Sequence, residues 1–468
     1  MGTLVLAAGV LTALAVDSPA AGLQNSAWPM LQRNAEHEGR TMAPISSSPS
    51  IVWSQAVTDS TEYSSPAIDL SGNLYIGDVG DRLTKVSPQG TVIWNYDTGG
   101  NLRRSSPAIA DDGTVYVGSS DGVLHAVNSD GTQRWTFTAG GPIKTSPTVG
   151  ADGSIYFGAD DGVLYSLDTA GAMRWSYATS DTIRSSPAIL SDTLVVVGSN
   201  DGGVYALRTD GTFRWNGFTG GPVKAGITVG QGDDIFVASQ DRFLYALRKH
   251  GALNWSIFTD NTLRTAPSIG IRGDIYLAQS NELFCYADDG DTSWVATLPA
   301  EILGTPIVHT NPPDSLETVI VGAEDGSLYG LVDGDIVWSV ALGGAIRGAA
   351  AVGADGTIYV GANDGRIYAL GDAPAGLADG TGAGWKLQVG PNPSVPGQSI
   401  SFRSPDGTDG RLLFLDPAGR RVGEAQLRDG AGVWDGKGAD GRDVAPGVYF
   451  YRLEAGGSTG SGRIIRVR

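Results

Sequence analysis

The feature that most constrains this chain is a tryptophan that returns at a nearly constant interval. The eight positions are separated by 41, 41, 40, 40, 40, 39 and 44 residues: Trp53, Trp94, Trp135, Trp175, Trp215, Trp255, Trp294 and Trp338. A period of this length indicates a repeat architecture, in which each unit buries its faces against its neighbours. We therefore interpret most of the 468 residues as one array rather than as unrelated domains.

Each repeat contains the pattern of four short strands. One copy, from Ser105 to Trp135, reads SSPAIADDGTVYVGSSDGVLHAVNSDGTQRW. The next copy, from Thr145 to Trp175, reads TSPTVGADGSIYFGADDGVLYSLDTAGAMRW. Apolar and polar residues alternate within the strands, and the Asp-Gly pairs between them supply the positive φ that tight hairpin turns require. Four strands in about 40 residues are typical of one blade of a β-propeller.

The array begins with a fourth strand and ends with a third. The tryptophan strand occurs eight times, first at 51–57, and the inner three-strand unit also occurs eight times, from 64–86 to 348–370. We predict an all-β fold, an eight-bladed β-propeller spanning 51–372. Its closure is by strand exchange, because the N-terminal strand completes the last blade by pairing with 366–370. Such pairing removes an exposed sheet edge.

The repeated wording DGxLYALxxxGxxxW, preceded by SSPAI, resembles the pyrroloquinoline-quinone-like repeat family of β-propellers. The segment WPMLQRNAEHEGRT, Trp28–Thr41, is similar to the lead-in of many members, and we assign 23–50 to it. The resemblance covers roughly residues 25–372. It implies that the repeated tryptophans pack between adjacent blades and are structural.

The first and last parts of the chain differ from the repeats. An apolar run, Leu4–Val16, precedes small residues, so we predict a signal peptide at 1–22, with a buried helix as the alternative. No cysteine follows this run, so no lipid anchor is expected. After a small-residue linker at 373–384, residues 385–468 alternate as about seven strands, which predicts a small Ig-like β-sandwich.

The tail carries PNP, GVYFYRLE and a final RIIRVR. These phrases resemble the Ig-like domain of the flagellar hook-capping protein and the C-terminal sorting domain of type IX secretion substrates. The second resemblance implies contact with the secretion machinery and a place at the cell surface or in the medium. A generic accessory sandwich remains open, as does a periplasmic location. No transmembrane segment is expected.

Composition excludes several kinds of function. Residues 386–468 carry 12 basic and 9 acidic side chains, which leaves 20 against 41, a net charge of −21, in residues 1–385. This negative charge disfavours nucleic acid as a partner, because nucleic acid is itself a polyanion. The one cysteine, Cys285, allows no intrachain disulfide. No two histidines have zinc-ligand spacing among His37, His125, His250 and His309.

Enzymes of the resembled family hold a quinone and a calcium ion in the central funnel, often with the quinone stacked between a tryptophan and a disulfide of adjacent cysteines. With one cysteine and compact blades, this chain departs from that pattern. We therefore expect no catalytic residues, no cofactor, no metal site and no enzyme activity. The leading hypothesis is an exported, non-enzymatic scaffold that binds a protein, a peptide or a small anionic ligand at its loop face or funnel. The alternatives are a scaffold for outer-membrane protein assembly, similar to the propeller lipoprotein of that machinery, and a quinone-dependent dehydrogenase.

One repeat position carries a candidate binding site. Just before each innermost strand, six of eight repeats have a basic residue, and the other two have Tyr63 and Leu303. The six are Arg104, Lys144, Arg184, Lys224, Arg264 and Arg347. We predict that they ring one mouth of the funnel, where they would attract carboxylates or phosphates. In the alternative interpretation, each pairs with an aspartate of the Asp-Gly turns on the same face: Asp121, Asp161, Asp201, Asp241, Asp325 and Asp364.

Overall fold

The computed structural model describes residues 28–191, 193–311 and 316–372 and, further on, 388–390, 399–403, 409–415, 421–438, 441–444, 447–455 and 458–466. The chain folds as two compact units, Met1–Ala375 and Gly376–Arg468. The predicted signal peptide at 1–22 and the predicted linker at 373–384 lie outside the described residues.

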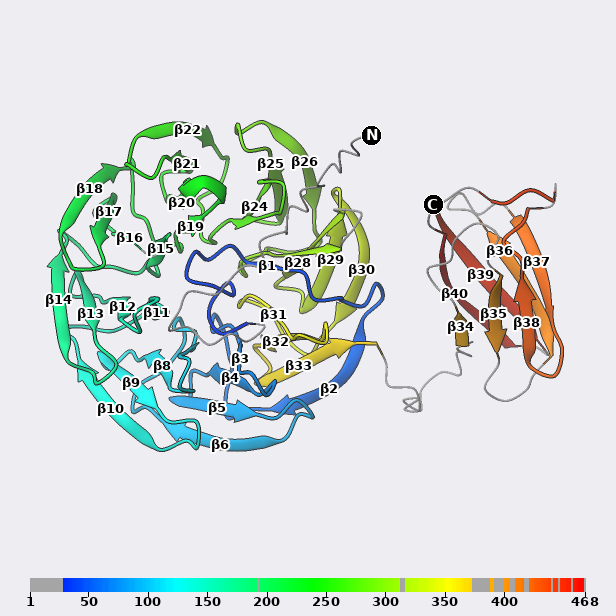
Figure 1. Cartoon of the computed structure of the whole chain (residues 1–468), viewed down its shortest axis with the longest axis horizontal. Helices are drawn as coiled ribbons and strands as arrows, with labels where there is room; N and C mark the ends of the chain where they lie inside the picture. Colours follow the sequence, from blue (N-terminus) through cyan, green and yellow to red (C-terminus); the bar gives the residue numbers. More distant parts are fainter. Residues whose placement is uncertain are drawn as a thin grey trace, which may run out of the picture. The chain divides into compact units, whose positions relative to one another are not determined.

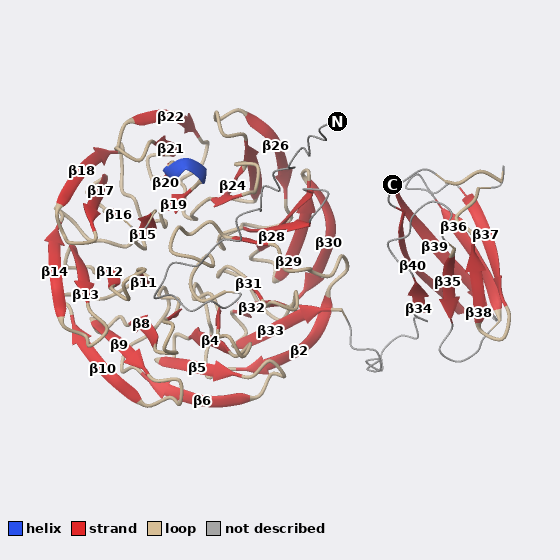
Figure 2. Cartoon of the chain, viewed as in Figure 1, coloured by secondary structure: helices blue, strands red, loops and turns tan. Residues whose placement is uncertain are grey.

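The first unit is an all-β, eight-bladed propeller (Figure 1). In the described part of the chain, its sheets surround a central channel, and each has four strands ordered from the channel outward, with a further two-residue strand, β1 (Arg40–Thr41), innermost in one of them. Helix is almost absent: among the described residues it amounts to the short 3-10 helix η1, Gln231–Asp233 (Figure 2). Across the same residues, no helix has the length and apolar character needed to span a membrane.

The strands occupy the same four positions in every blade, and the blades are numbered 1 to 8 in chain order. The innermost strands are β3 (Ala67–Ile68), β7 (Ala108–Ile109), β11 (Thr148–Val149), β15 (Ala188–Leu190), β19 (Thr228–Val229), β23 (Ser268–Ile269), β27 (Ile307–Asn311) and β31 (Ala351–Val352). The second strands are β4 (Leu74–Gly77), β8 (Val115–Gly118), β12 (Ile155–Gly158), β16 (Leu194–Gly198), β20 (Ile235–Ala238), β24 (Ile275–Gln279), β28 (Leu316–Gly322) and β32 (Ile358–Ala362). The third strands are β5 (Arg82–Val86), β9 (Val123–Val127), β13 (Val163–Leu167), β17 (Gly203–Arg208), β21 (Phe243–Leu247), β25 (Glu282–Tyr286), β29 (Ser327–Val332) and β33 (Arg366–Gly371). The outer strands are β6 (Val92–Asp97), β10 (Gln133–Thr138), β14 (Met173–Ala178), β18 (Phe213–Phe218), β22 (Leu253–Phe258), β26 (Thr292–Thr297), β30 (Asp335–Ala341) and, in blade 8, β2 (Ser50–Ala56).

Blade 8 differs from the others in where its outer strand comes from. In blades 1 to 7 the outer strand directly follows the third strand in the chain, whereas β2 precedes all eight blades. β2 pairs antiparallel with β33, with Trp53 opposite Ala369 and Ala56 opposite Arg366. No hairpin joins β2 to β33, so hydrogen bonds and side-chain packing hold them together.

The repeated tryptophans connect neighbouring blades, in agreement with their predicted structural role. The indole N–H of Trp94 donates to the carbonyl of Ser129 at 3.1 Å, and Trp135 bonds Thr169 in the same way at 3.0 Å. In each case the acceptor lies in the following blade, in the turn between its third and outer strands. A glycine with positive φ in that turn, Gly131 or Gly171, lies directly on the indole. A side chain at the glycine would collide with the ring, which explains why these turns are Asp-Gly or Ala-Gly.

The channel is filled by the segment that precedes β2. We call residues 28–41 the channel segment; it runs through the middle of the ring as the dark-blue trace in Figure 1 and ends in β1 (Arg40–Thr41), which pairs parallel with β27. Its buried side chains alternate with partly exposed ones, and Trp28, Met30, Gln32 and His37 have no solvent exposure. Its carbonyls accept hydrogen bonds from the inner strands of six blades, through the N–H groups of Ile68, Ile109, Ile189, Val229, Ile269 and Val308.

The second unit contains two antiparallel sheets in its described residues. One has the order β34 (Gln388–Gly390), β35 (Ile400–Arg403), β38 (Ala431–Trp434), and the other β37 (Arg421–Leu427), β36 (Gly410–Leu415), β39 (Gly447–Ala455), β40 (Ser458–Arg466). Both sheets contribute to one apolar core. Trp434 stacks on Phe414 with ring centroids 4.2 Å apart, so the core joins a strand of each sheet.

Candidate functional site

The loop that leads into each inner strand is anchored by an apolar side chain. In blade 3, Ile143 is buried, and its N–H donates to the carbonyl of Ser119 at 3.0 Å. Ile143 packs against Gly118 at the end of β8, where a Cβ would overlap with it. Blades 4 and 5 repeat the arrangement with Ile183 and Val223. The next residue is basic in all three blades, so the buried anchor positions a cation at the end of the channel.

All six predicted cations line one cavity of about 110 Å³ at this end of the channel. Tyr63 and Leu303 line it at the two non-basic positions, and Leu31 of the channel segment lines it as well. We call this cavity the basic mouth. The structure therefore brings the six residues together around one opening, while their role in binding remains a prediction.

Acidic side chains neutralise part of the basic mouth. Asp160 accepts from two neighbours, Lys144 Nζ at 2.5 Å and Arg184 Nε at 2.8 Å. Although burial opposes the change, the hydrogen bonds from Arg184 and Lys144 lower the pKa of the Asp160 carboxyl. Arg347 forms a two-pronged ion pair with Glu324, at 2.5 and 3.0 Å. A looser pair, at 3.7 Å, joins Arg264 and Glu301 in blades 6 and 7.

Two cations have no carboxylate partner among the described residues. Arg104 lies over the ring of Tyr63, with its guanidinium carbon 4.6 Å from the ring centroid. Burial, with the nearby charges of Arg103 and Arg184, lowers the pKa of Arg104 although Tyr63 and Glu62 oppose the change. Lys224 takes part in no ion pair or side-chain hydrogen bond within the part of the chain that the structure describes. The mouth therefore keeps an excess of positive charge.

The alternative prediction, that the aspartates of the Asp-Gly turns pair with the cations, is wrong about the partners. Asp161 instead accepts from the Tyr165 hydroxyl at 2.6 Å, the Val163 N–H at 3.0 Å and the Gly140 N–H at 2.8 Å. Asp201 and Asp241 have equivalent partners in their own blades. These carboxylates hold the turns, and burial together with the bond to Asp161 raises the pKa of Tyr165 to about 12.

A row of four serine hydroxyls, for which the sequence pattern had suggested no role, lines the same mouth as the cations. The N–H of Ser65 donates to Ser106 Oγ, that of Ser106 to Ser146 Oγ, and that of Ser146 to Ser186 Oγ, each at 2.9 Å. The N–H of Ala349 continues the series to Ser65 Oγ at 2.9 Å, so the bonds join five consecutive blades. These serines line the basic mouth. The first half of the recurring SSPAI phrase is the sequence signal for this ladder.

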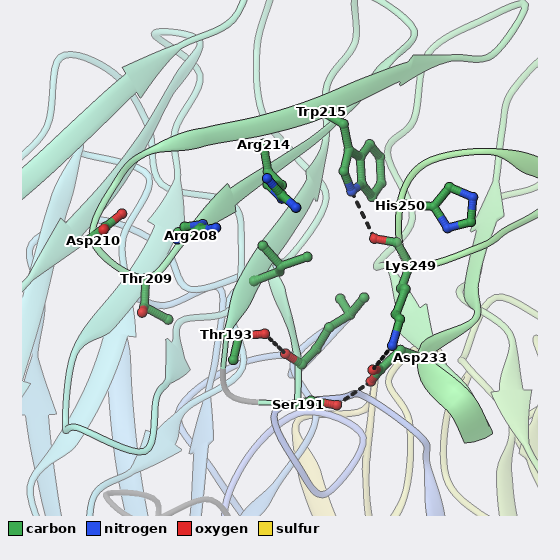
Figure 3. Close-up of a pocket in the computed structure, with 12 residues that line it drawn as sticks. Ser191, Thr193, Arg208, Thr209, Asp210, Arg214, Trp215, Asp233, Lys249 and His250 are labelled. Carbon is green, nitrogen blue, oxygen red and sulfur yellow. Dashed lines mark hydrogen bonds and ion pairs between the residues drawn. The ribbon is translucent and has the colours of Figure 1, made fainter.

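A larger groove lies between blades 4 and 5, and it was also missed from the sequence (Figure 3). It has a volume of about 800 Å³, within the usual range of ligand pockets, and it is lined by both signs of charge. Asp233 accepts from Ser191 at 2.5 Å and lies 4.0 Å from Lys249, and the Trp215 indole donates to the Lys249 carbonyl at 2.9 Å. These groups bond one another across the seam between the two blades.

The chain is similar to known proteins in its repeats and in its fold. The model of a protein family described as outer membrane protein assembly factor BamB matches residues 79–224, 217–332 and 272–370. No curated protein sequence matches the chain. Among solved structures, BamB from Moraxella catarrhalis is similar with a TM-score of 0.59 and 18% identity, over 69% of this chain and 99% of that chain.

Two solved dehydrogenases are also similar. A europium-containing methanol dehydrogenase has a TM-score of 0.63 at 13% identity, over 74% of this chain and 98% of that chain. The quinohemoprotein alcohol dehydrogenase from Comamonas testosteroni has a TM-score of 0.62 at 15% identity, over 78% of this chain and 83% of that chain. At these identities the likeness shows the fold.

The residues of the channel do not fit a quinone held in the centre of the ring. The channel segment occupies that space with fully buried side chains, and Gln32 donates from Nε2 to the carbonyl of Pro267 at 3.0 Å. Its carbonyls are bonded to six inner strands. A flat ring system in the channel would have to displace this segment and break those bonds. The single cysteine, Cys285, is buried in blade 6 and cannot form a disulfide of adjacent cysteines.

Proposed function

Since the chain belongs to the family described as outer membrane protein assembly factor BamB, we propose that it is an extracytoplasmic, non-catalytic scaffold that binds a partner across one face of its ring. The observation that carries this proposal is the filled channel. In a propeller, a central channel lined by side chains is a natural place for a cofactor and a reacting group. Here the channel segment is bonded to six blades, which leaves the two faces as the surfaces available to a partner.

A quinone-dependent dehydrogenase is the disfavoured alternative. Two similar structures are dehydrogenases by name, but at 13% and 15% identity they argue for the fold and not for the chemistry. We expect no dye-linked oxidation of alcohols or sugars when the purified full-length protein receives pyrroloquinoline quinone and calcium. Stoichiometric quinone binding with turnover would contradict the proposal.

The proposed docking face is tested by capturing a partner from a native envelope fraction. The full-length chain serves as bait, together with two charge-reversal variants on opposite faces: Arg104→Glu/Lys224→Glu at the basic mouth, and Arg208→Glu/Lys249→Glu at the groove. A scaffold with one docking face should keep its partner in one variant and lose it in the other. Equal capture by all three baits, or capture of nothing by the parent chain, would contradict a specific docking face.

A scaffold for outer-membrane protein assembly is the second candidate. It is favoured by the family match over more than half of the chain and by the coverage of 99% of the Moraxella catarrhalis BamB structure. Co-purification of an outer-membrane β-barrel assembly component in the capture experiment would support it. Recovery of only soluble partners would favour a scaffold of another kind.

We also propose roles for the two ends. Pairing of β2 with β33 closes the ring by strand exchange. The second unit is an Ig-like sandwich of the sorting type, which directs the chain to the cell surface or the medium. The shared core of its two sheets supports the sandwich, and the PNP and RIIRVR phrases support the sorting role. The predicted signal peptide at 1–22 completes this export route.

A further inference from the structure

We propose that the basic mouth binds a compact polyanion, a small molecule with at least two phosphate or carboxylate groups, over the arc formed by blades 2 to 5. This names the ligand class of one face of the scaffold and rests on the proposed function, because it requires a channel without a cofactor. The charge of the mouth, its hydrogen-bond donors and its enclosure each support this assignment.

The excess charge is confined to one arc of the mouth. Arg104, Lys144, Arg184 and Lys224 occupy four consecutive blades, and Asp160 is the one carboxylate that pairs with them among the described residues. This arc therefore carries a net charge of about +3. On the other side, Glu301 and Glu324 each pair with one arginine, which leaves that arc neutral. Residues 1–385 as a whole carry −21, so the arc is a local exception to the sign of the unit.

The serine ladder lines the same cavity as this arc of cations. Ser106, Ser146 and Ser186 use a lone pair of Oγ to accept a backbone N–H of the preceding blade. A hydroxyl has one proton to donate, and the described residues offer these three no acceptor. All three are nine-tenths buried or more, and all line the mouth. The arc thus presents cations and hydroxyl donors together, which is the combination that recognises anionic oxygens.

The basic mouth is partly enclosed. The channel segment closes the inner end of the mouth, where Leu31 lines the cavity. Within this partly closed space of about 110 Å³, charges interact more strongly than on an open surface. The size suits one small oxyanion group with further groups extending toward solvent. A monoanion would leave most of the excess charge unbalanced, so the site favours at least two negative charges.

The test uses the full-length protein and isothermal titration calorimetry at low and high salt. Pyrophosphate and citrate represent phosphate and carboxylate polyanions, and acetate is the monoanion control. We expect one site per chain for a polyanion, at least tenfold tighter than for acetate and weakened by salt. Binding of pyrophosphate alone would identify phosphate as the preferred group, and binding of citrate alone would identify carboxylate.

The variants locate the site. Arg104→Gln/Lys224→Gln should weaken polyanion binding at least tenfold, with little change in Tm because neither residue has a carboxylate partner. The matched control, Arg134→Gln/Arg174→Gln, removes two cations from outer strands, where they pair with Asp112 and Asp152. It should bind within about twofold of the parent chain, since screened charges outside the mouth contribute little.

A negative result in either experiment, the titration of the parent chain or the comparison of the variants, overturns the proposal. If neither pyrophosphate nor citrate binds the parent chain, the excess charge of the mouth holds no polyanion. If both double variants bind like the parent, the anion binds elsewhere. In each case the capture experiment still reports on the scaffold, because it measures retention of a macromolecular partner and not of a small anion.

Discussion

His37 shows how a single residue of the channel segment couples stability to pH. It is fully buried, its Nδ1 lies 3.1 Å from the carbonyl of Ile227, and its Nε2 has no partner among the described residues. Burial lowers the pKa of His37 to about 4, from an ordinary value of 6.5, although the bond to Ile227 opposes the change. The unfolded chain therefore binds one more proton than the folded chain between these two values.

We predict that this histidine makes the ring less stable as pH falls from 6.5 to 4, by about 3 kcal/mol. Above pH 6.5 both states carry a neutral imidazole and the effect vanishes. His309, whose pKa burial also lowers to about 4, acts in the same direction and window. Urea unfolding of the parent chain and of His37→Gln at pH 7.5 and 4.5 tests this. The variant should lose less stability on acidification, and equal losses would show that His37 is not titrating.

In blades 2 to 4, the glycine that ends the second strand packs against the buried apolar anchor of the following blade. Gly158 has no room for a Cβ, because Ile183 occupies that position. Gly158→Ala should therefore destabilise the propeller by about 2 kcal/mol through overpacking. Gly217→Ala is the control: it lies on the outer strand β18, and its nearest neighbour to a new Cβ is at 3.8 Å. Chemical denaturation compares the two, and equal midpoints would mean that Ile183 moves aside without cost.

At the scale of elements, β2 is the strand whose place depends on tertiary contacts. Trp53 donates from its indole to the carbonyl of Pro88 at 2.9 Å, as Trp135 does to Thr169 at 3.0 Å. Both indoles also contact a tyrosine, Tyr359 or Tyr116. The two tryptophans thus have the same local chemistry. They differ in that a hairpin ties the strand of Trp135 to its blade, whereas β2 has no such connection.

We predict that Trp53→Ala is more damaging than Trp135→Ala. Each should lose about 3 kcal/mol from the truncated side chain, but only Trp53→Ala should also detach β2 and expose the edge of β33. Hydrogen exchange at 366–371, with 123–127 as the reference strand, measures the difference, and thermal unfolding gives the total loss. Equal protection of both strands in the two variants would argue against β2 as the closure of the ring.

At the scale of the whole molecule, the two units share no sheet in the described residues. A chain ending at residue 375 should therefore keep the thermal midpoint of the propeller within about 2 °C, because no strand or core residue of the ring is removed. Differential scanning calorimetry of the truncated and full chains makes this comparison. A large loss would reveal a contribution from the second unit.

The same truncation tests the proposed sorting role in cells. If the second unit directs export, the truncated chain should accumulate in the periplasm and disappear from the surface and medium. Cell fractionation with the full-length chain as the control measures this. Unchanged export would leave the second unit as an accessory sandwich.

The sequence by itself determined the features that depend on the repeat interval and on patterns within a few residues. The interval between tryptophans determined the number of blades, because each blade needs one complete four-strand pattern. Alternation and Asp-Gly turns located the strands within a blade, since both signals act over a few residues. The recurrence of a basic residue before six of the eight inner strands placed the six cations at one end of the channel, because equivalent repeat positions have equivalent radius and height.

Only the tertiary structure decided which groups those cations contact and what fills the channel. Five of the six turn aspartates, Asp161 among them, bond a tyrosine of their own hairpin. The residue before Asp161, Asp160, is the one that reaches Lys144 and Arg184. A shift of one residue reverses the direction in which a side chain points. The repeat pattern does not determine which of two neighbouring turn residues points toward the cations. The sequence of the channel segment does not show the alternation of its burial, because its buried side chains include polar ones such as Gln32 and His37. Its course is set by hydrogen bonds to N–H groups on the inner strands of six different blades. These N–H groups face one common centre only once the ring has formed.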